Sequence, residues 1–133
     1  MIERLAIERV AWLTTVTPEG QPQTMPVWFT WVPSEAGGDA EILVYGDHRA
    51  RRNRNLESND RVSLALRTDE HGGEVHVIEG RAAIDPDFPP PGEHAPFMAK
   101  YGPRIDASFG GPAQFGQTYS VAIRIRPTRL IAY

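Results

Sequence analysis

Hydrophobic and polar residues alternate along much of the chain, which is the pattern of β-strands with one buried face. These segments are rich in β-branched and aromatic residues, which favours strands over helices. The predicted strands cover residues 10–17, 23–31, 41–45, 62–66, 75–84, 119–125 and 129–133. Pro18, Glu19 and Gly20 form a turn between the first two. Pro26 lacks the N–H that a strand ladder needs, so we expect it at a bulge or a sheet edge.

One segment, from Asp47 to Glu57, lacks this alternation and has few β-branched residues. Asp47 is well placed to cap the first turn, so we predict a helix of about three turns there. On that helix Ala50 and Leu56 face the barrel, and the polar residues from Ser58 onward end it.

Prolines and glycines dominate two later segments, which we predict as loops. Residues 85–96 contain five prolines and are expected to be extended. Residues 97–101 form one helical turn that Gly102 and Pro103 end, and a glycine-rich loop then runs to Gln117.

The predicted elements indicate the fold class. Several short strands, one helix inserted after the third strand and no regular strand–helix alternation predict a mainly β protein, a small β-barrel. The 133 residues are enough for one domain with its own core, and no internal repeat is present. We therefore expect residues 1–133 to form a single domain.

Composition excludes several kinds of site. The chain has no cysteine, which excludes disulfides, thiolate metal sites and cysteine nucleophiles. His71 and His76 lie five positions apart in a turn and a strand, which is not a metal-ligand spacing, so we expect no metal site. The sequence motifs of phosphate-binding loops, dinucleotide-binding folds and serine hydrolases are also absent.

Charge and hydropathy limit the partners. The formal net charge of −3 argues against a nucleic-acid-binding protein. No run of eighteen apolar residues exists that would cross a membrane, and the charged N-terminus lacks the apolar segment of a signal peptide. We therefore expect a cytoplasmic protein that binds neither nucleic acid nor membranes.

The cations are almost all arginine, and Lys100 is the single lysine. Helical spacing places Arg52 and Asn55 on one face, with Arg49 a turn earlier. Arg51 lies close enough to join Arg52 in gripping an anion, and guanidinium groups match phosphate or carboxylate with paired hydrogen bonds.

Residues 26–31 place aromatic side chains on both faces of a strand, about twenty residues before this arginine-rich helix. An apolar slot beside an anion clamp suits a planar aromatic cofactor with a phosphorylated tail. Two ordinary alternatives stay open at this point. Trp12, Trp28 and Trp31 can belong to a core or a dimer interface, and the arginines can form a merely solvated helix face.

Residues 12–31 resemble the opening hairpin of the pyridoxamine 5'-phosphate oxidase-like split β-barrels. Further segments follow the pattern of that family in the same order, at residues 42–45, 52–56, 60–64, 77–82 and 119–129. The resemblance therefore extends over nearly the whole chain. More narrowly, the chain is similar to the actinobacterial oxidoreductases that use the deazaflavin coenzyme F420, the flavin/deazaflavin oxidoreductase B group.

The resemblance implies a homodimer with two cofactor sites at the subunit interface. The cofactor ring would rest on the strand that contains Pro26, and the phosphate would meet the helix at Arg52, where the family usually has a lysine. The cofactor-binding residues implied are Pro26, Val27, Trp28, Tyr45, Gly46, Arg49, Arg51, Arg52 and Asn55.

The activity that the resemblance implies is hydride transfer between reduced F420 and an unsaturated small-molecule substrate. Two alternatives remain: an FMN enzyme of the same fold, and a protein that binds F420, haem or another tetrapyrrole without turnover. The sequence assigns no catalytic residue. Side chains with the chemistry of a proton donor are Tyr45, His48, His76 and Tyr101.

Overall fold

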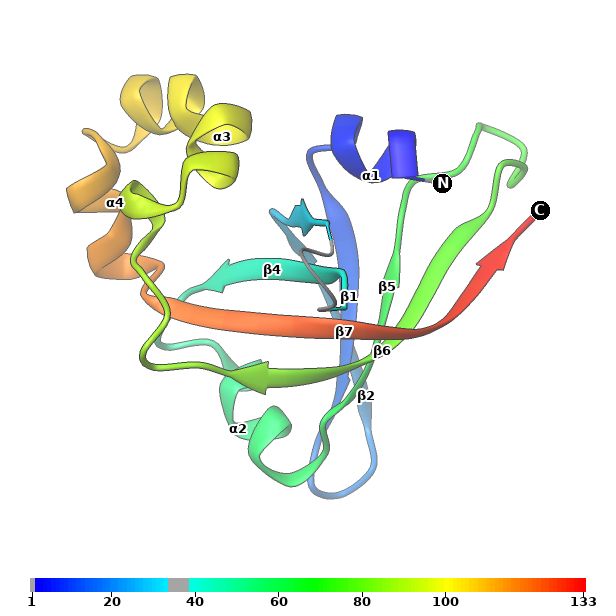
Figure 1. Cartoon of the computed structure of the whole chain (residues 1–133). Helices are drawn as coiled ribbons and strands as arrows, with labels where there is room; N and C mark the ends of the chain where they lie inside the picture. The colour runs from blue at the N-terminus through cyan, green and yellow to red at the C-terminus, as the bar shows by residue number, and fades with distance from the viewer. Residues whose placement is uncertain (1, 34–38) are drawn as a thin grey trace.

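The computed structural model describes residues 2–33 and 39–133. Its main element is one seven-stranded antiparallel sheet with the strand order β2-β1-β5-β6-β7-β4-β3. The sheet curls around a core (Figure 1). Its strands are β1 (Ala11–Val16), β2 (Pro22–Val27), β3 (Thr30–Val32), β4 (Glu41–Gly46), β5 (Arg61–Ala65), β6 (His76–Ile84) and β7 (Val121–Ala132). The predicted mainly β, barrel-like fold is confirmed.

Short helices cover the ends of the sheet. In the described residues these are α1 (Ile2–Ile7), α2 (Arg51–Ser58), a 3₁₀ turn (Pro91–Glu93), α3 (Ala95–Ser108) and α4 (Pro112–Thr118). Figure 1 shows α1 and α3 toward one end of the sheet and α2 toward the other. No helix of the described segments is long and apolar enough to cross a membrane.

Two apolar clusters share the strand β4, which is buried on both faces. Ile42 and Val44 face the interior of the curled sheet, where they join the larger cluster. Leu43 and Tyr45 alternate with them and face the helices, so they join a second cluster that is largely aromatic. The helix-side cluster also contains Phe97, Tyr101, Ile105, Phe115 and Ala122. This second core holds α3 and α4 against β4 and forms one wall of the site described below.

The prediction of one continuous strand over residues 23–31 is wrong. The structure has β2 and β3 instead, with Trp28 and Phe29 between them. The hydroxyl of Tyr101 explains the break, because it accepts the backbone N–H of Phe29 at 3.0 Å and lies 2.9 Å from the Phe29 carbonyl. Pro26 lies in β2, an edge strand, paired with Trp12, as predicted.

The arginine-rich helix is shorter than predicted. It begins at Arg51 and has eight residues, about two turns. Asp47 does not cap it, because its carboxylate accepts the backbone N–H of Arg49 at 2.8 Å and closes the preceding turn. Ala50 occupies the N-cap position without a side-chain hydrogen bond. Leu56 is buried in the core, as predicted.

The prediction of a single helical turn at residues 97–101 is also wrong, because α3 continues for 14 residues through Pro103. A proline inside a helix removes one hydrogen bond, and here packing outweighs that cost. Tyr101 and Ile105 are fully buried on either side of it. The following segment is helix α4 rather than a loop, with Pro112 in its first turn, where the missing N–H costs nothing.

The two predicted C-terminal strands are one continuous strand, β7. Pro127 is tolerated within it because the β6–β7 ladder changes register at Glu79 and Gly80. Pro127 pairs with Gly80 and Arg129 pairs with Glu79, so Thr128 is an extra residue that forms a bulge.

Gly80 is required by this bulge, and its replacement should destabilise the protein. A Cβ at position 80 would lie 2.7 Å from the backbone carbonyl oxygen of Arg126, which cannot move aside cheaply. We expect Gly80→Ala to lower the free energy of unfolding by about 1–3 kcal/mol, measured by urea denaturation. Gly102→Ala in α3 is the control, because its Cβ would meet only the end of the Met98 side chain at 3.5 Å, an ordinary contact, and alanine suits a helix. A loss no larger at Gly80 than at Gly102 would contradict this packing argument.

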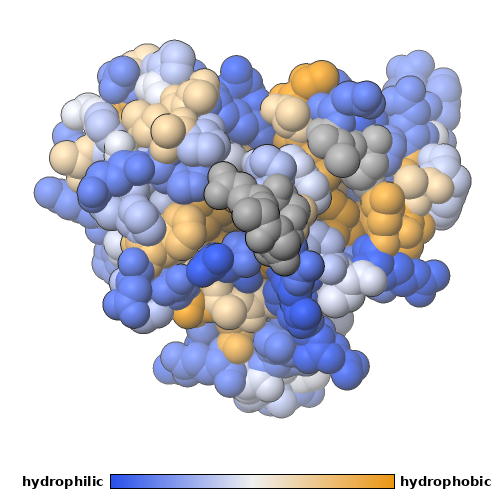
Figure 2. All heavy atoms as spheres, viewed as in Figure 1, coloured by the Kyte–Doolittle hydropathy of each residue, from blue (hydrophilic) through white to orange (hydrophobic). Residues whose placement is uncertain are grey.

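The face shown in Figure 2 is mostly hydrophilic, and its hydrophobic patches include some on the side where α1 and the C-terminal end of β7 lie. Ile7 in α1 is 72% exposed and Leu130 in β7 is 52% exposed. A second set of exposed apolar side chains lies on or beside β1 and β2, comprising Val10, Trp12 and Met25. Met25 lies on the edge strand β2, and Trp12 lies on the neighbouring strand β1.

Candidate functional site

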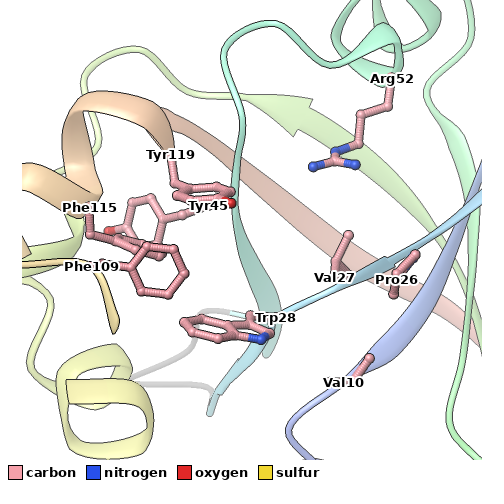
Figure 3. Close-up of a pocket in the computed structure, with 9 residues that line it drawn as sticks. All are labelled: Val10, Pro26, Val27, Trp28, Tyr45, Arg52, Phe109, Phe115 and Tyr119. Carbon is pink, nitrogen blue, oxygen red and sulfur yellow. The ribbon is translucent and has the colours of Figure 1, made fainter. Parts of the chain in front are cut away.

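A hollow of about 370 Å³ opens where β2 ends and α3 and α4 approach β4. Figure 3 shows its lining: aromatic rings on one side, the end of β2 below, and Arg52 reaching toward it from α2. The lining residues are Val10, Pro26, Val27, Trp28, Tyr45, Arg52, Phe109, Phe115 and Tyr119. We refer to this hollow as the Arg52 pocket.

The aromatic wall of the Arg52 pocket is a set of nearly parallel rings. Trp28 stacks on Tyr101 with ring centroids 4.6 Å apart and planes 3° apart, and Phe115 lies 5.7 Å from Trp28 on a near-parallel plane. Phe115 in turn stacks on Tyr119 at 4.6 Å. Phe109 meets both Trp28 and Phe115 edge to face. Such a wall offers flat apolar surface to a planar ring system.

Trp28 owes its place in this wall to the break between β2 and β3. The Tyr101 hydroxyl fixes the backbone of the next residue, Phe29, and also lies 2.7 Å from the Arg9 carbonyl, to which it donates. Burial raises the pKa of Tyr101, so its hydroxyl keeps its proton. The ring stack and the hydroxyl together lock the Trp28 segment onto α3.

Arg52 is the one cation that lines the Arg52 pocket, and its charge is not compensated. Its Nε atom is buried without a hydrogen-bond partner, and within residues 2–33 and 39–133 it forms no ion pair. Burial lowers the pKa of Arg52, against the opposing field of Asp47. The Asp47 carboxylate is held by Arg49 at 2.9 Å instead. A half-buried guanidinium with an unpaired Nε–H has the chemistry to hold an anion.

Gly46 makes room for this arginine. A Cβ at position 46 would lie 3.3 Å from both Nε and Nη2 of Arg52, tighter than ordinary contact. The predicted residues Pro26, Val27, Trp28 and Tyr45 line the Arg52 pocket itself. The structure thus brings these four together with Arg52, and places Gly46 against the arginine.

The other predicted residues lie on the far side of α2. Arg49, Arg51 and Asn55 line a polar hollow of about 690 Å³ between α2 and the β1–β2 turn, together with Arg54. Arg51 also shares a smaller hollow with Arg52, which connects the two regions. The Asn55 amide donates to the Thr15 hydroxyl and the Gln23 side chain, both at 2.9 Å. Asn55 therefore joins α2 to the β1–β2 hairpin.

Sequence reasoning missed the residues that form much of the aromatic wall: Val10, Phe109, Phe115 and Tyr119. Phe109 and Phe115 belong to the segment interpreted as a glycine-rich loop, and Tyr119 belongs to the strand predicted over residues 119–125. The available signal was Pro112, since proline after glycine is typical of the first turn of a helix. A helix there would have carried Phe115 and Tyr119 to one face.

Of the four candidate proton donors, Tyr45 alone lines the Arg52 pocket. Burial and the negative charge of Glu93 raise its pKa to about 12, and its hydroxyl donates to the Pro89 carbonyl at 2.7 Å. The Tyr101 hydroxyl is committed to the backbone, as described above. His48 and His76 do not line the pocket. Within the described residues, no cluster of three or more metal-ligating side chains occurs.

His94 makes the stability of the pocket's α3 wall sensitive to pH. Its Nδ1 accepts the backbone N–H of Phe97 at 3.2 Å, which caps α3 and requires a neutral ring. Burial lowers the pKa of His94 below its usual 6.5. The unfolded chain therefore binds the proton more readily, and stability contributed by this group is lost as the pH falls below about 6.5.

We expect the unfolding free energy of the wild type to fall more steeply between about pH 7.5 and pH 5 than that of His94→Asn. Asparagine keeps a capping oxygen but does not titrate, and the other three histidines are common to both proteins. Urea denaturation at each pH measures the difference. Parallel pH profiles would contradict the assignment of His94 as a neutral cap.

The curled sheet, its open edge and the flanking helices define the class of split β-barrels. The profile of the family described as pyridoxamine 5'-phosphate oxidase matches residues 2–132. The chain belongs to this family. No curated protein matches the sequence.

Solved structures that resemble the chain have several described roles. An F420 reductase is 25% identical, with 97% of this chain and 94% of that chain aligned at a TM-score of 0.70. The haem storage protein HutZ from Vibrio cholerae is 19% identical, with 98% and 91% aligned at a TM-score of 0.59. An FAD-binding protein from Mesorhizobium loti is 18% identical, with 97% and 86% aligned at a TM-score of 0.58. The similarity establishes the fold that these proteins share with the chain.

Proposed function

We propose that the protein is a coenzyme F420-dependent oxidoreductase, which transfers a hydride between reduced deazaflavin and an unsaturated small molecule. The observation that carries this proposal is the uncompensated, half-buried Arg52 guanidinium beside a wall of parallel aromatic rings. This pair of features matches a planar ring system with a phosphate on its side chain. The 25% identity to an F420 reductase over nearly the full length of both chains also supports it.

The arginines beyond Arg52 favour F420 over FMN. F420 carries several carboxylates on an oligoglutamate tail, whereas FMN has only its phosphate. Arg49, Arg51 and Arg54 line the polar hollow that continues from Arg52 around α2 and outnumber its one acid, Glu19. Of these arginines, Arg49 alone forms an ion pair among the described residues. A cationic track of this kind suits an anionic tail and exceeds what a single phosphate needs.

The residues of the chain have separate tasks in this function. The bound deazaflavin supplies the hydride chemistry. Arg52 holds the phosphate, the end of β2 at Pro26 and Val27 supports one edge of the ring system, and Trp28 flanks it. The apolar wall excludes water from the reacting face. The Tyr45 hydroxyl keeps its proton at neutral pH but donates it to the Pro89 carbonyl, so Tyr45 serves the aromatic wall rather than the reacting atoms.

We further propose that the protein acts as a cytoplasmic homodimer of single-domain chains, with a second copy completing each site. The apolar side chains exposed on β1 and on the edge strand β2 support this arrangement. Trp12 is 47% exposed and Met25 is 58% exposed, and Val10 beside them lines the Arg52 pocket. A partner covering this edge would enclose the pocket and bury these side chains.

Titration of the purified protein with oxidised F420 and, separately, with FMN tests the proposal. Trp28 lies in the pocket wall, so ligand binding should quench the intrinsic tryptophan fluorescence. We expect saturable quenching with a Kd in the micromolar range or below for F420, and binding at least about tenfold weaker for FMN. Preference for FMN would assign the protein to the flavin branch of the fold, and absence of both would remove the cofactor assignment.

A further inference from the structure

Lys100, the single lysine of the chain, lies in a second hollow, where α3 meets α1 and β3. This hollow is at the end of the sheet that carries α1, away from α2 and its arginines (Figure 1). Its volume is about 480 Å³. The lining residues are Leu5, Ala6, Ile7, Arg9, Thr30, Trp31, Pro96, Ala99 and Lys100. It shares none of them with the Arg52 pocket, and we refer to it as the Lys100 hollow.

The ammonium group of Lys100 is held in a fixed position with one N–H to spare. Nζ donates to the Phe29 carbonyl at 2.8 Å and to the Leu5 carbonyl at 3.3 Å, and it lies 3.9 Å from the centre of the Phe29 ring. An ammonium group has three N–H donors, so the third has no oxygen or nitrogen acceptor among the described residues and faces only aromatic rings or the hollow. The group is thus pre-oriented for one more acceptor.

The charge of Lys100 is reinforced by a second cation and is not neutralised. Arg9 donates from Nη1 to the Lys100 carbonyl at 2.7 Å, which places its guanidinium beside the same hollow. Burial and the Arg9 charge lower the pKa of Lys100 to about 8, while Glu8 acts in the opposite direction. The Glu8 carboxylate is already shared by Arg4 at 3.1 Å and Arg67 at 3.0 Å. Neither Lys100 nor Arg9 forms an ion pair within the described part of the chain.

Two further features concern the lining of the Lys100 hollow. The Thr30 hydroxyl is buried there without a hydrogen-bond partner, in a residue that is only 4% exposed. Ile7, Trp31 and Pro96 supply apolar surface, and Ile7 is one of the most exposed large hydrophobic residues of the protein. The hollow therefore combines a cationic end, an unsatisfied hydroxyl and an apolar wall.

We propose that the Lys100 hollow is a second ligand site, which binds a small carboxylate with an apolar tail. The carboxylate oxygens accept hydrogen bonds from the free N–H of Lys100 and from the Arg9 guanidinium, and the tail lies against Ile7 and Trp31. Charge complementarity selects the head group, since two adjacent cations without an acidic partner favour one anion. This site is independent of the cofactor proposed above.

The single lysine makes a direct test possible. Protein labelled with ¹³C at the lysine Cε position gives one side-chain signal, that of Lys100, and octanoate serves as the probe. We expect octanoate at concentrations up to about 10 mM to shift this signal saturably. We also expect the pKa of Lys100, followed by the same signal, to rise by about one pH unit, because a nearby anion favours the ammonium form.

Three controls separate this site from its alternatives. Octanol has the same tail without the charge and should leave the pKa of Lys100 unchanged. Arg9→Gln should weaken octanoate binding by about fivefold, because one of the two cations is removed. Arg52→Ala should leave it unchanged, so the result does not depend on the cofactor assignment. An unmoved Lys100 signal, or an equal response to octanol and octanoate, would overturn the proposal.

Discussion

Replacement of Arg52 by alanine should weaken the binding of oxidised F420 by about ten- to a hundredfold. The loss of a charge-assisted hydrogen bond to phosphate is worth about 1–3 kcal/mol, and no other cation lines the Arg52 pocket. Arg52→Lys keeps the charge without the paired donors, so its loss should be smaller. Fluorescence titration of each variant measures the effect, and Arg104→Ala, an exposed arginine of α3 outside the pocket, is the matched control.

The stability of the same variant distinguishes a ligand-binding arginine from a structural one. Arg52 is half-buried without an ionic partner in the described residues, so its charge contributes a desolvation cost to folding rather than a stabilising contact. We therefore expect Arg52→Ala to unfold in urea at the same free energy as the wild type or at a higher one. A clear loss of stability together with unchanged F420 affinity would remove Arg52 from the site.

The second large effect is expected at Tyr101. Replacement by alanine should lower the free energy of unfolding by about 3–5 kcal/mol, because a fully buried aromatic ring is lost from the core against β4. Tyr101→Phe retains the ring and leaves the N–H of Phe29 and the carbonyl of Arg9 without their partner. Its expected loss is smaller, about 1–3 kcal/mol.

The two variants should also differ in the pocket. Tyr101→Ala removes the ring on which Trp28 stacks, so F420 binding should weaken as well as stability. Tyr101→Phe keeps the stack, so we expect its cofactor affinity to change less than its stability. Urea denaturation and the fluorescence titration measure both quantities. Equal stability of the wild type and Tyr101→Phe would show that the hydroxyl does not hold the β2–β3 break.

Strands with one face in a core could be predicted from the alternation of apolar and polar residues, and β4 could be predicted from its continuous apolar run, because both of its faces are buried. β1, β4, β5 and β6 lie close to their predicted positions. β7 shows the limit of local rules. Pro127 indicated a break, but a bulge opposite Gly80 on the neighbouring strand accommodates the proline without ending the ladder. A distant pairing partner of this kind is not visible in a local pattern.

Part of the candidate site could also be predicted from the sequence. Residues 26–28 and Arg52 indicate a site through their residue types alone: a strand proline, an aromatic side chain and a cation. The opposite wall was missed, because Phe109 and Phe115 lie in a segment whose glycines and prolines indicated a loop, and Tyr119 was assigned to a strand, whereas α3 and α4 bring all three into the pocket. Asn55 was correctly predicted to lie on the helix, but its side-chain amide donates to Thr15 and Gln23 instead of lining the Arg52 pocket.

The central claim is that Arg52 holds the phosphate of a bound cofactor at the mouth of an aromatic pocket. The ³¹P NMR signal of F420 in the presence of the protein tests this contact directly. We expect a distinct, shifted signal for F420 bound to the wild type, and a signal at the free position for Arg52→Ala at the same concentrations. A bound ³¹P shift that is identical in the wild type and in Arg52→Ala at saturation would contradict the account.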